Sequence, residues 1–244
     1  MKRKSTVISI VSGKGGVGKS IVGVNLAEVL ASGGHSVALV DADFGQGACR
    51  ILLNESPGST LLDVADHVRL SRDVMHRTAS GITLVEAATE PGQAEHRLYG
   101  ALDQIVAELR SGHEFVLIDT PAGVDGPVRW ALDRADLGLL VLVGEPTAIA
   151  DAYRLTKMIW QVEPGYPFGT VVNFADSEED ARGVVERFNK VTLHFVGPVT
   201  NFLGWIPFSA VIRQSVADQT PVVRNEGPVR AQFERIAGTI AEDL

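Results

Sequence analysis

A glycine-rich run with two lysines, residues 13–20, holds the residue types that bind nucleotide phosphates. Its sequence, Gly13-Lys14-Gly15-Gly16-Val17-Gly18-Lys19-Ser20, fits the pattern G-x-x-x-x-G-K-S/T at every fixed position. The glycines let backbone N–H groups approach phosphate oxygens, and the N-terminus of a following helix adds positive charge. Lys19 is expected on the β- and γ-phosphates and Ser20 on Mg²⁺. The alternative is a glycine-rich turn with surface lysines, which the complete pattern disfavours.

Two aspartate turns follow apolar runs and could complete a phosphoryl-transfer site. Asp41-Ala42-Asp43 follows residues 36–40, and Asp119 follows residues 115–118. The carboxyl ends of parallel strands meet at one edge of a sheet, so these carboxylates should lie near the phosphate loop. We expect Asp43 to orient or deprotonate the attacking water beside the metal, and Asp119 to contact Mg²⁺ directly or through water. As an alternative, aspartates after strands commonly cap the next helix or turn.

The elements that must position these residues can be predicted from hydrophobic periodicity. Strands are predicted over residues 6–12, 36–40, 82–85, 115–118, 137–143, 169–173 and 202–207. Helices are predicted over residues 19–30, 48–53, 60–68, 93–110, 147–160, 178–195, 210–218 and 228–243. This alternation requires a mostly parallel sheet with helices on both faces. The expected fold is a doubly wound α/β fold, with residues 1–244 forming a single domain.

Composition limits the classes of function. The chain has 244 residues, 45% of them hydrophobic, and a formal net charge of −8. The negative charge argues against a general nucleic-acid binder, which needs clustered lysine and arginine. No run approaches the length of a membrane span, and the basic start leads straight into a strand, so we expect a cytoplasmic protein. The only cysteine, Cys49, excludes an intramolecular disulfide and a four-thiolate cluster within one chain.

Lys14 is a second cation in a loop that needs one lysine for its own phosphates, and a solvated loop lysine is the simplest interpretation. The run from Lys14 to Ser20, however, resembles the deviant Walker A motif of the MinD/ParA family of dimeric P-loop NTPases. The turns at Asp43 and Asp119 resemble the two switch regions of that family. The resemblance implies an ATPase that uses ATP and Mg²⁺ and forms a homodimer when ATP is bound. It also implies that Lys14 reaches the partner's nucleotide and acts like an arginine finger.

Within that family, several segments of the second half are most similar to the flagellar-number regulator subgroup FlhG, also called FleN or YlxH. They are residues 145–153, 171–173, 181–188, 204–208 and 211–213. By this resemblance Asn173 would hydrogen-bond the adenine, and the Pro207 segment would line the base pocket. Ile21 would join the nucleotide-binding residues, and Glu145 would reach the partner's nucleotide. The implied partner is a regulatory protein of the FlhF or MinC type, with no specific nucleic acid.

The resemblance implies an ATP-dependent dimerisation switch that controls the placement or number of a flagellum-type or division-site-type assembly. Two alternatives remain open: a ParA-like partitioning ATPase, and a metal-insertion or iron–sulfur carrier ATPase. Relatives in the family end in an amphipathic helix that touches the inner face of the membrane. The apolar stripe of the last helix in this chain lacks a basic polar face. We therefore expect that helix to pack on the domain's own sheet, with peripheral membrane contact as the alternative.

Overall fold

The computed structural model describes residues 5–44, 47–56, 58–59, 61, 64, 71–87 and 95–243. Its strands are β1 (Thr6–Val11), β2 (Val37–Asp41), β3 (His76–Arg77), β4 (Thr83–Glu86), β5 (Phe115–Asp119), β6 (Leu137–Leu142), β7 (Phe168–Ala175) and β8 (Asn201–Pro207). Its α-helices are α1 (Lys19–Ser32), α2 (Ala48–Leu53), α4 (Glu95–Gly112), α5 (Gly126–Leu132), α6 (Pro146–Val162), α7 (Glu178–Phe195), α8 (Ala210–Ala217) and α9 (Pro228–Asp243). Two short 3₁₀ helices are η1 (Ser71–Val74) and η2 (Val222–Arg224).

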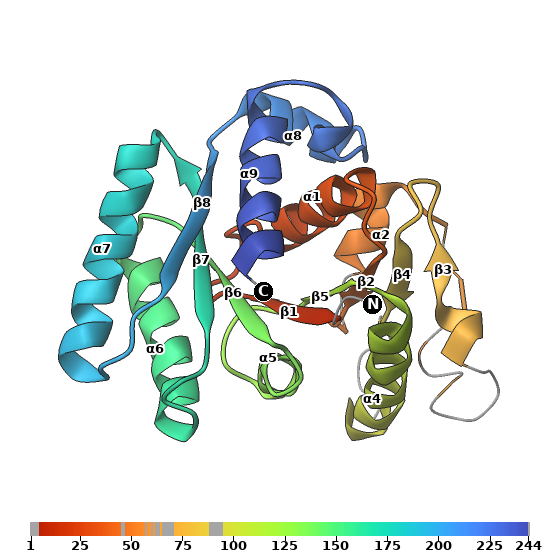
Figure 1. The fold of residues 1–244 in the computed structure, drawn as a ribbon, viewed down its shortest axis with the longest axis horizontal. Helices are drawn as coiled ribbons and strands as arrows, with labels where there is room; N and C mark the ends of the chain where they lie inside the picture. Colours follow the sequence, from red (N-terminus) through yellow and green to blue (C-terminus); the bar gives the residue numbers. More distant parts are fainter. Residues whose placement is uncertain are drawn as a thin grey trace.

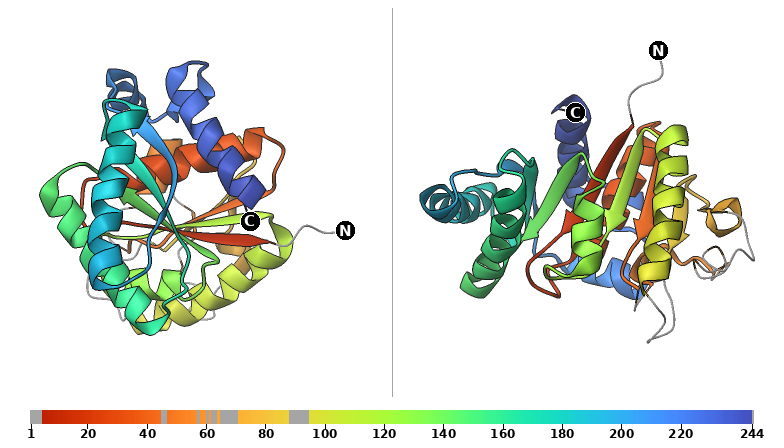
Figure 2. Two further views of the ribbon diagram at one scale, coloured as in Figure 1. Left: turned by 60° about the vertical axis from the view of Figure 1, so that its left-hand side comes forward. Right: turned by 90° about the horizontal axis from the view of Figure 1, so that it is seen from below.

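The described strands form one sheet in the order β3-β4-β2-β5-β1-β6-β7-β8. Neighbouring strands are parallel except for β3, which pairs antiparallel with β4 at one edge. Figure 1 shows α1, α8 and α9 on one side of the sheet and α4 and α5 on the other, with α6 and α7 beside β7 and β8. The views in Figure 2 show the same two layers. The predicted doubly wound, mostly parallel α/β fold is confirmed.

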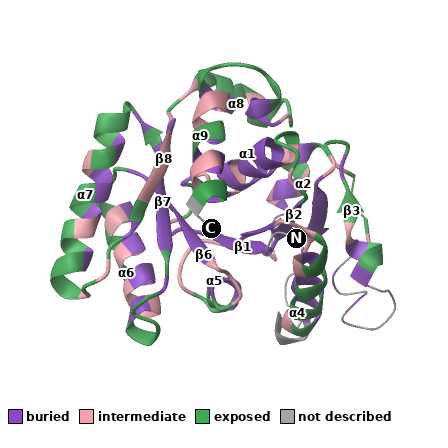
Figure 3. Cartoon of the chain, viewed as in Figure 1, coloured by how far each residue is buried: buried purple, intermediate pink, exposed green. Residues whose placement is uncertain are grey.

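Strand β1 shows how the sequence builds both layers. Ile8 and Ile10 are fully buried in the core that contains α1 and α9, whereas Val7 is buried in the core that contains α4. Successive side chains of a strand point to opposite faces, so a continuous apolar run produces a strand covered on both sides. Figure 3 shows the resulting buried band along the sheet. The phosphate loop leaves the carboxyl end of this central strand.

Helix α1, which follows the phosphate loop, is buried on nearly all sides. Buried residues run without a break from Val22 to Leu30, so this part of the helix has no solvent-exposed face. It lies between the sheet and α9, and a Cβ on Gly23 would sit 2.8 Å from the side chain of Ile10. The glycine therefore allows α1 to approach β1 closely, which fixes where the loop ends.

The apolar stripe of α9 lies inside the protein. Val229, Phe233, Ile236, Ala237 and Ile240 are all buried in the core shared with α1 and the sheet. A Cβ on Gly204 of β8 would lie 2.6 Å from Ile236, so the helix also contacts the edge strand closely. The prediction that this helix packs on the protein's own body is confirmed. Leu244, which also belongs to the predicted stripe, lies outside the described residues.

Several described elements differ from the sequence prediction, which included neither η1 nor η2. Helix α5 was not predicted, because its start at Asp125-Gly126-Pro127 resembles a turn, although proline is favoured in the first turn of a helix. The two-residue strand β3 is polar and exposed, so it carries no hydrophobic pattern. Strand β7 extends to Ala175 instead of ending at residue 173. Most of the helix predicted over residues 60–68 lies outside the described residues.

Candidate nucleotide and metal site

The phosphate loop joins the end of β1 to α1, and its shape depends on its glycines. Gly16 and Gly18 have φ angles of 77° and 90°, in the left-handed region that favours glycine. Gly13 lies against α6, where a Cβ would come within 2.1 Å of the Asp151 backbone. The loop is thus held between α6 and the start of α1.

Lys19 lies inside the loop. Its side chain is buried, and its Nζ donates to Ser12 Oγ at 3.0 Å. Ser12 Oγ in turn donates to the carbonyl oxygen of Lys14 at 2.8 Å. Burial lowers the pKa of the Lys19 ammonium, while the carboxylates of Asp119 and Asp43 act in the opposite direction. The charge is therefore held in place before any phosphate arrives.

The Lys14 side chain reaches the start of α6. Its Nζ lies 2.5 Å from Glu145 Oε2 and 3.4 Å from Thr147 Oγ1. Both partners of the ion pair are exposed, with 40% of the Lys14 side chain and 62% of the Glu145 side chain open to solvent. The structure thus brings together the two residues that the resemblance assigns to a partner's nucleotide.

An open cavity of about 640 Å³ lies beside the loop. Seven predicted site residues line it: Gly15, Gly16, Gly18, Lys19, Ser20, Ile21 and Asp43. The remaining lining comes from α2, the turn after β5 and α8: Ala48, Ile51, Leu52, Pro121, Ala122 and Val216. The cavity joins the phosphate loop to both aspartate turns, which is the arrangement that phosphoryl transfer needs.

Asp119 lies beneath this cavity at the end of β5, next to Asp41 at the end of β2. The two are register partners on neighbouring strands, and both are fully buried. Burial and the nearby Asp41 raise the pKa of Asp119 to about 7, whereas Ser20 and Lys19 lower it. Asp119 Oδ1 accepts no hydrogen bond of good geometry within the part of the chain that the structure describes. An orphaned carboxylate oxygen near the Ser20 hydroxyl fits the oxygen ligands that Mg²⁺ prefers.

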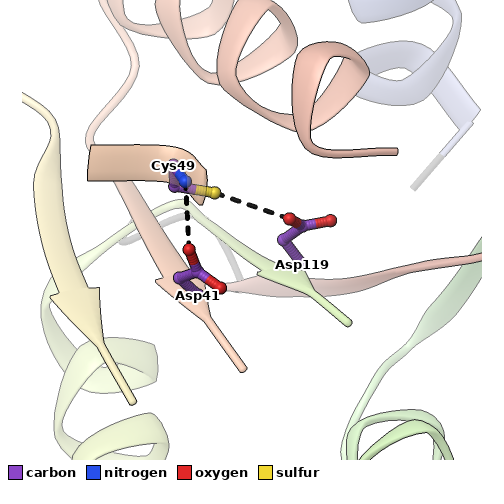
Figure 4. Close-up of side chains that lie close together, drawn as sticks. All are labelled: Asp41, Cys49 and Asp119. Atoms are coloured by element: carbon purple, nitrogen blue, oxygen red, sulfur yellow. Dashed lines mark hydrogen bonds between the residues drawn. The ribbon is translucent and has the colours of Figure 1, made fainter. Parts of the chain in front are cut away.

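Cys49 completes this buried group (Figure 4). Its backbone N–H donates to Asp41 Oδ2 at 3.0 Å, and its Sγ lies 3.6 Å from Asp119 Oδ2. Asp41 Oδ1 accepts the backbone N–H of Asp43 at 3.1 Å. Both ends of the segment from Asp43 to Cys49 are therefore bonded to Asp41.

Asn173 lies under the phosphate loop. Its Nδ2 donates to the carbonyl oxygen of Val17 at 2.8 Å, and its Oδ1 accepts the backbone N–H of Phe174 at 3.0 Å. A Cβ on Gly18 would lie 2.4 Å from Asn173 Nδ2, so the amide fits closely against the loop. Pro207 ends β8 and pairs with Ala175 at the end of β7. The adenine contacts assigned to Asn173 and Pro207 stay predictions.

Phe174 is a site candidate that the sequence reasoning missed. It is the exposed residue of an otherwise buried strand, and its φ of 60° is unusual for a bulky side chain. The register of β7 against β8 shifts between Asn173 and Ala175, which turns the Phe174 ring outward. The ring lies 6.0 Å from that of Phe208, which is also exposed. Two exposed aromatic rings beside a phosphate loop offer a surface on which a base can stack.

Comparison with known proteins fits this geometry. A family model described as "ParA: NUBPL iron-transfer P-loop NTPase" matches residues 3–241. The chain belongs to the ParA family of P-loop NTPases. FleN of Pseudomonas aeruginosa, described as an antiactivator, is 34% identical over 219 residues, which cover 88% of this chain and 78% of that protein. The flagellum site-determining protein YlxH of Helicobacter pylori is 26% identical over 255 residues, covering 100% of this chain and 84% of that protein.

Solved structures share the fold. MinD of Pyrococcus horikoshii, complexed with Mg-ADP, has a TM-score of 0.79 and 25% identity, with 97% of this chain and 96% of that chain covered. A MinC:MinD complex from Aquifex aeolicus gives a TM-score of 0.80 at 23% identity, with 98% and 96% covered. As a member of the ParA family with FleN-like sequence, the protein is an ATPase that uses ATP with Mg²⁺.

One observation bears on the iron–sulfur carrier alternative. Cys49 is fully buried, so its thiol cannot share an iron–sulfur cluster with a second copy across a protomer surface. The cysteine-bridged carrier is therefore not favoured for this family member. Within the described residues, no helix combines the length and apolar character needed to cross a bilayer.

Phe208 and Cys49 were also missed by the sequence reasoning, and they differ in whether the sequence contains a signal for their place in the site. Phe208 directly follows Pro207, so a base pocket predicted at the end of β8 could have included it. Cys49 offers no such signal, because a single buried cysteine is most often a small apolar core residue. Its contacts with two strand ends depend on how α2 returns to the sheet, which no local pattern specifies.

Proposed function

We propose that this ParA-family ATPase is a dimerisation switch, in which ATP and Mg²⁺ close two copies face to face and hydrolysis reopens them. The observation that carries the proposal is the divergence of the two loop lysines. Lys19 is buried beside the cavity, whereas Lys14 lies outside it and faces solvent at the start of α6. A lysine in that position is available to a site on another molecule, as the deviant Walker A resemblance implies.

Each residue of the site then has one role within residues 1–244, which we treat as a single working unit. The loop backbone from Gly13 to Gly18 and Lys19 bind the phosphates, and Ser20 and Asp119 hold Mg²⁺, which neutralises phosphate charge when bound. Asp43, at the cavity wall, orients the attacking water on the metal side. Lys14 stabilises the charge that develops on the partner's phosphates, a role worth about 10³- to 10⁵-fold in rate for arginine fingers.

The contact between Lys14 and Glu145 must then be exchanged when two copies meet. Solvent screens this ion pair, so it contributes no more than about 1 kcal/mol. A partner's phosphates carry more charge than one carboxylate and can compete for the lysine. Glu145 is freed by the same exchange, which agrees with its expected position near the partner's nucleotide.

FleN and YlxH support a cellular role in setting the number or position of flagella. In this role the ATP-bound dimer is read by a regulatory protein of the FlhF or MinC type, in the cytoplasm. Nucleic acid is not proposed as a partner, because the net charge is −8. The buried stripe of α9 gives no support to a membrane-anchoring helix, so any contact with the inner face of the membrane would use other residues.

Size-exclusion chromatography with light scattering tests the switch. Asp43→Ala should slow hydrolysis and hold the protein as a dimer with ATP, and as a monomer with ADP. Asp133→Ala, an exposed aspartate after α5, is the matched control and should behave as the wild type. An Asp43→Ala protein that stays monomeric at saturating ATP and Mg²⁺ would sink the dimerisation proposal.

A cellular experiment tests the proposed process. Cells from which the gene is removed should carry a changed number or arrangement of flagella in electron micrographs. The wild-type gene should restore the normal pattern and the Lys14→Ala gene should not. Unchanged flagella in the deletion strain would contradict the flagellar role while leaving the ATPase assignment intact.

A further inference from the structure

The two carboxylates at the ends of β2 and β5 are buried and need hydrogen-bond donors. Asp41 and Asp119 are fully buried register partners on adjacent strands. Buried carboxylates need hydrogen-bond donors, since an unpaired charge in a low-dielectric site is costly. The groups that donate hydrogen bonds to each carboxylate therefore determine how it is oriented.

Cys49 is a donor to both carboxylates. Figure 4 shows its backbone directed to Asp41 and its sulfur directed to Asp119. The distances are 3.0 Å from the backbone nitrogen to Asp41 Oδ2 and 3.6 Å from Sγ to Asp119 Oδ2. The S–H group is a weak hydrogen-bond donor, and at this distance it donates to Asp119 Oδ2.

This contact leaves the two oxygens of Asp119 in different positions. Oδ2 is turned to the thiol, while Oδ1 accepts no hydrogen bond of good geometry from any described residue. Lys19 and Ser20, which line the cavity, both act on this carboxylate. A partial rotation of the carboxylate would break the contact with sulfur. The thiol thus fixes the orientation in which the other oxygen is presented to the metal.

The same residue connects the metal carboxylate to the segment that carries Asp43. Asp41 accepts the N–H groups of both Asp43 and Cys49, so one carboxylate closes both ends of that segment. Cys49 lies in the first turn of α2 and joins that closure to Asp119. A displacement of Asp119 would therefore displace Cys49, and through Cys49 the segment that carries Asp43.

We infer that Cys49 is a positioning residue for the metal: its thiol holds Asp119 so that Oδ1 faces the ion, and its N–H couples that orientation to the Asp43 segment. This inference rests on the proposed role of Asp119 as a Mg²⁺-binding residue. Partners that orient metal ligands from outside the coordination shell typically change metal affinity by about 10- to 100-fold when removed. Cys49 touches neither nucleotide nor water in this scheme and acts only through the two aspartates.

The test compares Cys49→Ala, which removes the donor, with Cys49→Ser, which keeps a donor of similar size. Mn²⁺ replaces Mg²⁺ as a spectroscopic probe, and its binding to the protein–ADP complex is measured by electron paramagnetic resonance. Cys49→Ala should weaken Mn²⁺ binding about tenfold, whereas Cys49→Ser should stay within about threefold of the wild type. Affinity for ADP without metal, measured with a fluorescent ADP analogue, should be the same in all three proteins.

Leu53→Val is the control for loosened packing, because Leu53 is also buried in α2 but its apolar side chain cannot donate a hydrogen bond to the carboxylates. It should bind Mn²⁺ as the wild type does. Equal Mn²⁺ affinity of wild type and Cys49→Ala would overturn the inference, as would an equal loss in Leu53→Val. If Cys49→Ala does not fold, Cys49→Ser decides: a loss above tenfold there overturns the inference, and near-normal affinity supports it. A wild-type protein without metal-dependent ATP turnover would instead refute the proposed function.

Discussion

The site has two regions that differ in burial and in how they are held. The buried centre consists of residues that are closed off from solvent and hydrogen-bonded within the centre: Ser12, Lys19, Asp41, Cys49 and Asp119. The exposed rim consists of residues whose side chains face solvent around the loop: Lys14, Glu145, Phe174 and Phe208. The centre is built and held by contacts within one chain, whereas the rim presents charged and aromatic groups that are open to further partners.

This difference separates preorganisation from assembly. The centre fixes its donors and carboxylates before nucleotide binds, and fixed dipoles in a dry site are the effective ones in catalysis. The rim is held by a solvent-screened ion pair and by one pair of aromatic rings. Such contacts can be exchanged at low cost when a base or a second copy arrives. Variants that separate these two regions therefore test the comparison directly.

The largest effect is expected for Lys14 in the rim. Lys14→Ala should lower ATP turnover by about 10³-fold while leaving ATP affinity close to normal, because the lysine serves the other protomer. The sharper measurement mixes Lys14→Ala with Asp43→Ala, each inactive alone. Mixed dimers contain one complete site, formed by Asp43 of one copy and Lys14 of the other. Phosphate release should recover to about a quarter of the wild-type rate, since half of the dimers are mixed.

The control for this experiment is Lys157→Ala, which removes a lysine on α6 whose ammonium lies over the Tyr153 ring. It should turn over ATP as the wild type does, alone or in mixtures. If mixing the two inactive proteins restores nothing although mixed dimers form, Lys14 acts within its own chain. The assignment of Lys14 to the rim, on which the division between centre and rim mainly depends, would then be wrong.

Most of the fold could be predicted from the sequence because its signals are local. The β-branched and apolar runs of a buried parallel sheet predicted every strand in the described residues but β3, which is two exposed polar residues long. The two strand-end aspartates followed from the rule that carboxyl ends of parallel strands share an edge, and the register of Asp41 with Asp119 shows this. Helix α5 was missed because Gly126 and Pro127 indicate a turn as well as a helix start.

The candidate site was predictable where a motif fixes spacing and not where tertiary packing decides. The loop from Gly13 to Ser20 is one contiguous pattern, so its residues could be named in advance. Cys49 reaches Asp119 across 70 positions of sequence, and no periodicity indicates that contact. Phe174 is turned outward by a shift in strand register, which the alternating pattern of β7 does not reveal. The bond from Asn173 to Val17 likewise spans 156 positions.

A smaller effect is expected for the aromatic part of the rim. Phe174→Ala should weaken ADP binding by about tenfold, because stacking of a base on an aromatic ring is worth about 1–3 kcal/mol. Pyrophosphate, which has no base, should bind unchanged. Isothermal titration calorimetry with both ligands separates the two effects. Phe195→Ala, which removes an exposed ring at the end of α7, is the matched control and should change neither affinity.

If Phe174→Ala weakens ADP and pyrophosphate equally, the ring supports the loop and is not a base-binding group. The strained φ of 60° would then serve the shape of β7 alone. Equal binding of ADP to wild type and variant would remove Phe174 from the site altogether.

The smallest effect concerns Asn173, which lies between the two regions and decides where their boundary runs. Its amide is buried and donates to Val17, so the structure places it with the loop backbone and the centre. Asn173→Ala removes a donor from a buried carbonyl, a loss of about 1 kcal/mol that corresponds to roughly fivefold in affinity. A residue that shapes the loop should weaken ADP and pyrophosphate by the same factor. If the residue binds adenine, as the family resemblance implies, its loss should weaken the binding of ADP alone.

Asn189→Ala is the control, because Asn189 makes a comparable bond to the carbonyl of Thr200 at 2.9 Å outside the site. We expect the equal loss, since the amide that would have to meet adenine is already committed to the loop.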